Sequence, residues 1–182
     1  MSNAAKSTDN KKIPQGYPRG CGIEWQSKHS FHMRGHDFRI PTSFEDMFAI
    51  DEKIDKEIFY LAKFPDLVSR YINRFAKREL RNVLELGVFR GGSAAFLQLI
   101  AKPERLLALE LSSPRVEILD RFIKTEGLDK SLRVEYGVDQ ANTAVVRKLA
   151  TEHLGTGRCI DLVIDDASHI LAPCRTSFEA LF

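Results

Sequence analysis

The chain has 182 residues, of which 43% are hydrophobic, and a formal net charge of +2. This length fits one domain with a spare N-terminal segment, and the near-balanced charge argues against nucleic-acid and membrane partners. There is no apolar run near the roughly 20 residues of a transmembrane helix, no signal-peptide core in residues 1–12 and no paired spacing among the three cysteines, so we expect a cytoplasmic protein.

The first 79 residues precede the clearest pattern in the chain. Residues 1–20 are polar, with prolines and glycines near their end, which predicts a disordered tail. Residues 21–79 are expected to form an N-terminal helical or cap segment. In it, residues 21–41 have no clear period, whereas residues 44–64 place apolar side chains at helical spacing, namely Met47, Ile50, Ile54, Ile58 and Leu61.

Two capping boxes are available to start this helix. Either Thr42 with Glu45 or Ser43 with Asp46 has the required spacing, and the sequence leaves both open. The dipeptide at residues 64–65, Phe-Pro, interrupts the helical pattern, which resumes over residues 66–80.

From residue 82 onwards, short apolar strands alternate with helical patterns. The expected strands cover residues 82–89, 105–111, 131–137 and 159–166, and the expected helices cover residues 91–102, 113–127, 141–155 and 172–182. This alternation predicts an α/β protein with a doubly wound, parallel, Rossmann-like sheet. Such a sheet rarely stops after four strands, so we expect it to be incomplete, with residues 80–182 forming the N-terminal part of a longer domain.

The first of these strands ends in the glycine-containing stretch ELGVFRGGS, which includes Glu85, Gly87 and Gly91. A glycine after a strand usually forms only a turn, but it also lets a ligand lie against the backbone. The stretch is not the G-x-G-x-x-G pattern that binds a pyrophosphate. With a carboxylate two residues before its single turn glycine, it favours a cofactor that carries an ammonium or a sulfonium.

Acidic residues follow at the ends of the next two strands. Glu110 lies where a carboxylate commonly accepts both ribose hydroxyls of a nucleotide, although a solvated strand-end carboxylate is the plain alternative. Asp139 and Gln140 could border an adenine or a substrate, or Asp139 could cap the next helix. Acidic groups at the carboxyl ends of three successive strands together favour S-adenosylmethionine, with a nicotinamide dinucleotide as the rival cofactor.

The last expected strand ends in VIDDASH, with Asp165, Asp166 and His169. Side chains alternate along a strand, so the two carboxylates should point in different directions, one toward a cofactor and one toward a substrate pocket. A carboxylate suits Mg²⁺, and a nearby histidine suits a general base. The plain alternative is that the aspartates cap a loop and the histidine is solvated.

The stretches VLELGVFRGGS, LALEL, GVDQ and VIDDASH, in this order and spacing, resemble the class I S-adenosylmethionine-dependent methyltransferases. They are most similar to the metal-dependent branch that contains macrolide-sugar O-methyltransferases and the cephalosporin-hydroxylase-named family. The resemblance covers about residues 80–182, and VIDDASH is its most specific part. It implies an O-methyltransferase that acts on a hydroxyl, expected to be a sugar hydroxyl of a small molecule or glycan.

The resemblance also implies roles for individual residues. Asp166 would bind Mg²⁺ or a similar divalent cation, His169 would be the base, and Asp165 would face the cofactor or loop amides. The cofactor would be held by Glu85, Gly87, Gly91, Glu110, Asp139, Gln140 and Asp165. In the resembled family a Glu-Asp pair on the next strand completes the metal site, and this sequence ends at Phe182, before such a strand.

The sequence allows three other interpretations. His29, His32 and His36 with Cys21 could suggest zinc, but the spacing is not a familiar tetrahedral set, so a segment folded over the pocket or a homo-oligomer contact is favoured. The chain could also be a non-catalytic nucleotide-binding or scaffold fragment, or an NAD-dependent enzyme.

Overall fold

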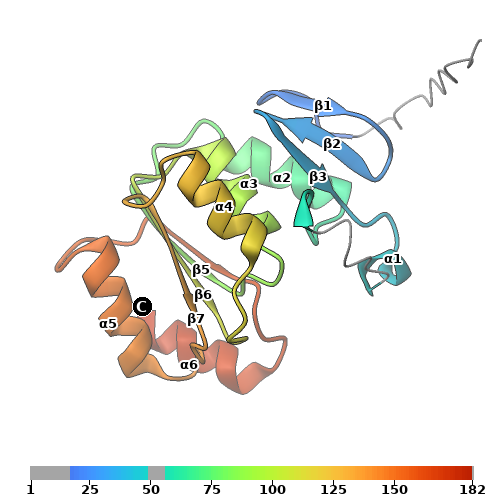
Figure 1. Cartoon of the computed structure of the whole chain (residues 1–182). Coiled ribbons are helices and arrows are strands. Elements are labelled where there is room, and N and C mark those ends of the chain that lie inside the picture. Colours follow the sequence, from blue (N-terminus) through green and yellow to red (C-terminus); the bar gives the residue numbers. More distant parts are fainter. Residues whose placement is uncertain (1–16, 49–55, 182) are drawn as a thin grey trace, which may run out of the picture.

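The computed structural model describes residues 17–48 and 56–181, and within them the chain forms two four-stranded sheets (Figure 1). The larger sheet contains β5 (Asn82–Leu86), β6 (Arg105–Glu110), β7 (Leu132–Tyr136) and β8 (Leu162–Asp165), all parallel, in the order β7-β6-β5-β8. The predicted Rossmann-like α/β architecture is therefore confirmed.

The strand order places a topological switch beside β5. From β5 the chain builds outward through β6 and β7, and then returns to add β8 on the other side of β5. In sheets of this kind, ligands bind beyond the carboxyl ends of the strands at such a switch. The glycine-containing turn after β5 and the VIDDASH stretch after β8 flank it.

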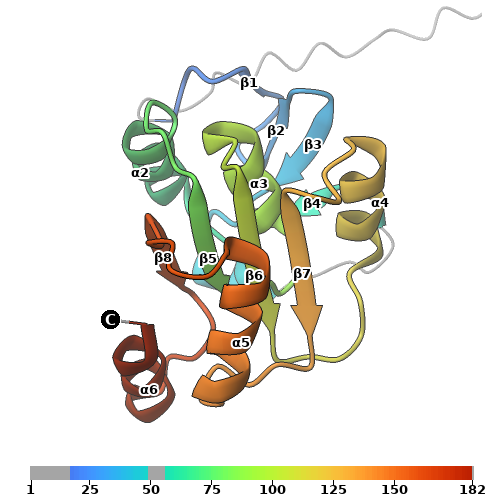
Figure 2. The same cartoon turned by 90° about the vertical axis from the view of Figure 1, so that its left-hand side faces the viewer.

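Helices cover both faces of this sheet (Figure 2). On β5, Val83 belongs to one core cluster and Leu84 and Leu86 to a second, as the two-residue period of a strand requires. The first cluster includes side chains of α3 (Gly92–Ala101) and α4 (Glu117–Thr125), and the second includes those of α5 (Thr143–Leu154). The last helix, α6 (Leu171–Leu181), contacts α5.

The N-terminal segment contains a small sheet that the sequence analysis did not predict. Its strands are β1 (Ile23–Trp25), β2 (Ser30–Met33), β3 (His36–Arg39) and β4 (Phe59–Tyr60). β2 and β3 form a hairpin in which Met33 pairs with His36. The two loop residues, Arg34 and Gly35, have φ values of 49° and 87°, the left-handed pair that a tight hairpin turn needs.

The helix predicted over residues 44–64 is largely wrong. The structure has a short α1 (Phe44–Phe48), the strand β4, and α2 (Pro65–Phe75); Ile50 and Ile54 lie outside the described residues, as does most of the predicted tail. Leu61 donates its backbone N–H to the Arg39 carbonyl at 2.8 Å, which extends the pairing beside β3. Pairing with an existing strand outweighs the local helical spacing.

Aromatic side chains join the small sheet to the large one. Phe38 stacks between Phe31 and Phe59, with ring centroids 5.0 and 5.3 Å away. Phe96 of α3 packs edge-on against Phe31 and Phe38, and Phe122 of α4 packs edge-on against Phe59. The small sheet therefore belongs to the same hydrophobic core as α3 and α4.

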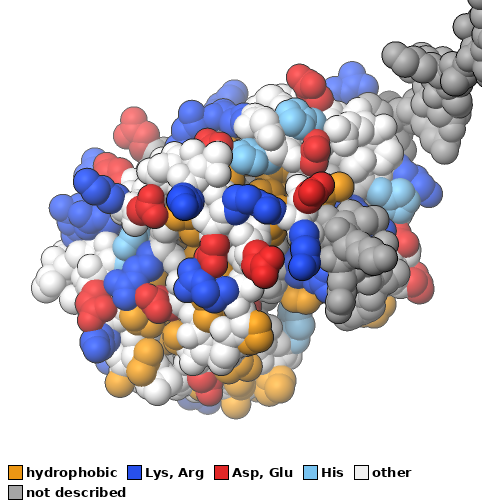
Figure 3. Space-filling model, in the orientation of Figure 1, with side chains coloured by type: hydrophobic (Ala, Val, Ile, Leu, Met, Phe, Trp, Pro, Cys, Tyr) orange, Lys and Arg blue, Asp and Glu red, His pale blue; other side chains and the backbone are white. Residues whose placement is uncertain are grey.

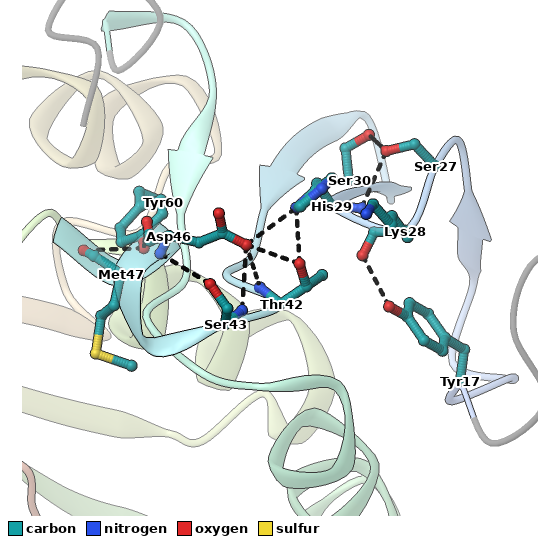
Figure 4. Close-up of polar contacts among 10 residues, drawn as sticks. All are labelled: Tyr17, Ser27, Lys28, His29, Ser30, Thr42, Ser43, Asp46, Met47 and Tyr60. Carbon is teal, nitrogen blue, oxygen red and sulfur yellow. Dashed lines mark hydrogen bonds and ion pairs between the residues drawn. The ribbon is translucent and has the colours of Figure 1, made fainter. Parts of the chain in front are cut away.

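The start of α1 uses the second of the two predicted capping boxes (Figure 4). The Ser43 Oγ accepts the Asp46 N–H at 3.2 Å, and the Asp46 carboxylate accepts the Ser43 N–H at 3.1 Å. The Thr42 hydroxyl also donates to Asp46, at 2.7 Å. These donors lower the pKa of Asp46, with the Thr42 hydroxyl contributing most.

Two observations concern the hydropathy of the helices and the charge of the surface. Within the described residues, no helix is long and apolar enough to cross a membrane. On the face drawn in Figure 3, basic and acidic side chains are interspersed, as the formal net charge of +2 leads one to expect.

The contact between β4 and the start of α3 yields a prediction. A Cβ added at Gly92 would lie 2.1 Å from the Tyr60 carbonyl oxygen, so Gly92→Ala must displace the backbone of β4. We expect it to lower the free energy of unfolding by about 2–3 kcal/mol, measured by urea denaturation. At an unconstrained helical position the same change would stabilise by up to about 1 kcal/mol, so a neutral or stabilising result would contradict this packing. Gly127→Ala is the comparison: its new Cβ meets nothing within 4 Å, but its φ of +65° strains an alanine by about 1–2 kcal/mol, so it measures backbone strain without a collision.

Candidate functional site

A cleft of about 600 Å³ lies at the carboxyl edge of the large sheet. Each of the four strands of that sheet contributes to it, through the segment that follows or ends the strand. Its lining includes Gly87 and Phe89 after β5, Glu110 and Leu111 at the end of β6, Val138, Asp139 and Gln140 after β7, and Asp166 and His169 after β8. The sequence-predicted residues therefore largely converge on one hollow at the topological switch.

Gly87 is required by a close approach of two backbone segments. It has φ of +92°, and a Cβ there would lie 2.6 Å from the Asp166 carbonyl oxygen. Gly91, which was also predicted to hold the cofactor, does not line the cleft. A Cβ on Gly91 would lie 2.9 Å from the Cβ of Leu119 in α4, so helix packing explains this glycine.

Glu110 holds the glycine-containing turn in place at the cleft. Its Oε2 accepts the backbone N–H groups of Val88 and Phe89 at 2.9 and 2.8 Å, and its Oε1 accepts that of Ser112 at 2.8 Å. The carboxylate that orders this turn therefore also lines the cleft.

Asp139 and Gln140 both line the cleft but have structural partners as well. Asp139 accepts the Ala141 N–H at 2.8 Å, whereas the N-cap of α5 is Asn142. Gln140 is buried, and its amide donates to Asp165 at 3.3 Å and to the Ser177 hydroxyl at 3.2 Å. Gln140 therefore links the end of β7 to β8 and α6.

The two adjacent aspartates point in different directions, as strand alternation predicts. Asp165 accepts from Gln140, from Ser177 and, at 3.4 Å, from the loop amide of Ala167. It does not line the cleft, so a direct cofactor contact is not supported for it. Asp166 does line the cleft, and its Oδ2 lies 2.6 Å from the ammonium of Lys63.

Lys63 is a functional candidate that the sequence analysis missed. Its side chain is only 2% exposed, although it carries a charge, and its Nζ also lies 5.0 Å from the centre of the Tyr71 ring. Burial lowers the pKa of Lys63, but Tyr71, Asp166 and Glu85 together raise it further, so it stays above the ordinary value. The only sequence signal is a single lysine within the otherwise apolar stretch FYLAKF.

Glu85 lies beneath the cleft rather than on its surface. It is fully buried in β5, and neither carboxyl oxygen has a hydrogen-bond partner of good geometry among the described residues. Burial raises the pKa of Glu85 to about 7, while the neighbouring Ser93 hydroxyl and Lys63 act in the opposite direction. The predicted contact of Glu85 with the cofactor is not supported, because Glu85 is absent from the lining.

The described residues do not fit the predicted Mg²⁺ site. They include no group of three or more His, Cys, Asp or Glu side chains that could hold a metal ion. The predicted ligand, Asp166, has a lysine ammonium as its partner, and that cation would repel a divalent metal.

The zinc reading is also not supported. His29, His32 and His36 each pair with a different carboxylate, namely Asp46 at 3.8 Å, Asp37 at 2.8 Å and Glu126 at 3.1 Å. The histidines therefore do not converge on a common point among the described residues.

His169 lies in the exposed loop between β8 and α6, where it lines the cleft together with Asp166. Contacts of Ser168 order this loop: its hydroxyl accepts the Ile170 N–H at 3.2 Å, and its carbonyl accepts the Cys174 thiol at 2.6 Å. The imidazole is thus exposed at the mouth of the cleft, on an ordered support.

Comparison with protein families and with curated proteins finds no match. Among solved structures, the chain is similar to the MycE methyltransferase from the mycinamycin biosynthetic pathway, solved in complex with Mg, SAH and mycinamycin VI. The identity is 24%, the TM-score is 0.39, and the match covers 62% of this chain and 26% of that one. Cofactor-bound Rv0187 from MTB is also similar, with 21% identity, a TM-score of 0.43, and coverage of 74% and 53%.

The chain thus spans about a quarter of the length of MycE and about half of that of Rv0187. Similarities this distant assign no activity. The chain's own strand order and switch-point cleft define it as a Rossmann-like α/β protein.

The buried Glu85 makes the stability of the fold depend on pH. Because its pKa is raised from 4.5 to about 7 on folding, its contribution is full below pH 4.5 and is lost as the pH rises through about 7. Glu85→Gln, which cannot ionise, should have a higher free energy of unfolding than the wild type near pH 8.5, by up to about 3 kcal/mol. Near pH 4.5 the two proteins should have about the same free energy of unfolding.

This is measured by urea denaturation across the pH range, with the exposed Glu79→Gln as the control. If the free energies of unfolding of the wild type and of Glu85→Gln change in parallel at all pH values, Glu85 does not cause the pH dependence of stability.

Proposed function

We propose that this protein is an S-adenosylmethionine-dependent methyltransferase that transfers a methyl group to a hydroxyl. The observation that carries the proposal is the cleft at the switch point, which combines the ordered Glu110 carboxylate, a single-glycine turn and an exposed histidine. The sequence resemblance of VLELGVFRGGS and VIDDASH to such enzymes supports the same conclusion.

The nucleoside would lie against β6 and β7. The cleft is bordered there by Phe89 and Leu111, which are 53% and 69% exposed, and by the buried Val138. Large apolar side chains left exposed beside a cleft are typical of a ligand contact, and here they suit a flat adenine. The ribose hydroxyls would donate to Glu110, which borders the same region.

The charge of the cleft favours a cationic cofactor over a dinucleotide. Glu110, Asp139 and Asp166 give it acidic side chains at the ends of three strands. A sulfonium is attracted to such a surface, whereas a pyrophosphate is repelled. The turn also lacks the glycine pattern that lets a pyrophosphate approach the backbone.

His169 is the group that would prepare the acceptor. Its imidazole would take the proton from the acceptor hydroxyl while the oxygen attacks the methyl carbon, and S-adenosylhomocysteine would leave with the electron pair of the broken carbon–sulfur bond. A neutral amine already carries a free lone pair and would not need such a base. We include a sugar hydroxyl as the acceptor class because of the resemblance in VIDDASH. No step uses a metal, since the described residues do not fit one.

The cofactor is tested by calorimetry. We expect S-adenosylhomocysteine to bind, NAD not to bind, and Glu110→Ala to weaken S-adenosylhomocysteine by about 1–3 kcal/mol because charge-assisted hydrogen bonds are lost. The exposed Glu104→Ala is the control and should leave the affinity unchanged. Binding of NAD alone would replace this proposal with an oxidoreductase, and binding of neither would favour a non-catalytic fragment.

The role of His169 is tested by turnover. In an active enzyme with a known acceptor, His169→Ala should lower kcat by roughly 10²–10⁴, the usual range for a general base, because the hydroxyl keeps its proton. The affinity for S-adenosylhomocysteine should stay the same, because the imidazole is not needed to bind the nucleoside. An unchanged kcat would exclude His169 as the base.

A further inference from the structure

Next to the main cleft lies a recess of about 30 Å³ that the proposed nucleoside position does not use. Lys63, Ser93 and Asp166 line it, together with Gly87, and it shares Gly87 and Asp166 with the cleft. One water molecule needs about 10–15 Å³ of such space, so the recess admits a small charged group but not a ring. A ligand lying in the cleft could therefore extend only a small group into it.

The recess contains two opposite charges side by side. The Lys63 ammonium and the Asp166 carboxylate are 2.6 Å apart, and the lysine side chain is 2% exposed while that of the aspartate is 43% exposed. A phosphate or a divalent cation would compensate one of these charges and be repelled by the other. A group that carries both a carboxylate and an ammonium compensates both, which is the pattern of an α-amino acid.

The polar groups around Lys63 add to this preference. Ser93 lies in the first turn of α3, whose N-cap, Gly91, supplies no side-chain hydrogen bond. Beneath the recess, the buried Glu85 has oxygens without partners of good geometry among the described residues, and it helps to keep Lys63 charged. The lysine is held in place before any ligand arrives, so little side-chain freedom is lost on binding.

We propose that Lys63 binds the carboxylate of the amino-acid end of the cofactor, while Asp166 accepts hydrogen bonds from its ammonium. This inference rests on the proposed function, because it assumes that the nucleoside lies in the adjoining cleft. It assigns a specificity role to a residue of the N-terminal segment, which lies outside the stretches that resemble methyltransferases.

Calorimetry with two ligands tests the inference. S-adenosylhomocysteine carries both charges, and decarboxylated S-adenosylhomocysteine keeps the ammonium but lacks the carboxylate. We expect the wild type to bind the first about 10–100-fold more tightly, in line with one hydrogen bond between charged groups. Lys63→Met should remove this preference by weakening S-adenosylhomocysteine alone, Lys63→Arg should keep most of it, and the exposed Lys77→Met should keep all of it.

Each outcome decides between specific alternatives. If Lys63→Met weakens both ligands equally, the lysine has only a structural role and the inference is wrong. If Lys63→Met does not fold, the wild type still decides, since equal affinity for the two ligands overturns the inference while leaving the proposed cofactor intact. If the wild type binds neither ligand, the proposed function itself fails.

Discussion

The ion pair between Lys63 and Asp166 is the contact on which the arrangement of the cleft depends. It joins the N-terminal segment to the end of β8, directly above the buried Glu85. A buried lysine is costly unless it is paired, and here Asp166, Glu85 and the Tyr71 ring surround it. Removing Asp166 would leave the buried ammonium without its ion-pair partner, so the position of β8 and that of the N-terminal segment are tied to each other.

Close backbone contacts at two glycines also fix the relative positions of the segments around the cleft. Gly87 allows the turn after β5 to touch the backbone at Asp166, and Gly92 allows the start of α3 to touch the carbonyl of Tyr60. Both contacts leave no room for a Cβ. These two glycines thus position three segments around the cleft, and of the two only Gly87 also lines it.

Much of the large sheet could be predicted from the sequence because β5 to β8 are short apolar runs separated by helical patterns. The opposite directions of Asp165 and Asp166 followed from strand alternation alone. The small sheet was missed because its hairpin turn, Arg34-Gly35, lacks the usual asparagine or aspartate, and because residues 44–64 imitate a helix. Lys63 and the packing role of Gly91 could not be found, since both depend on residues distant in the chain.

The separation of Lys63 and Asp166 by 103 residues also has a consequence for folding kinetics. The phenylalanines of the small sheet can pack as soon as α3 and α4 exist, but the ammonium of Lys63 gains its carboxylate only after β8 has docked. If this contact forms after the rate-limiting step, its loss accelerates unfolding and barely slows folding. The ion pair would therefore set how long the native protein persists rather than how quickly it is reached.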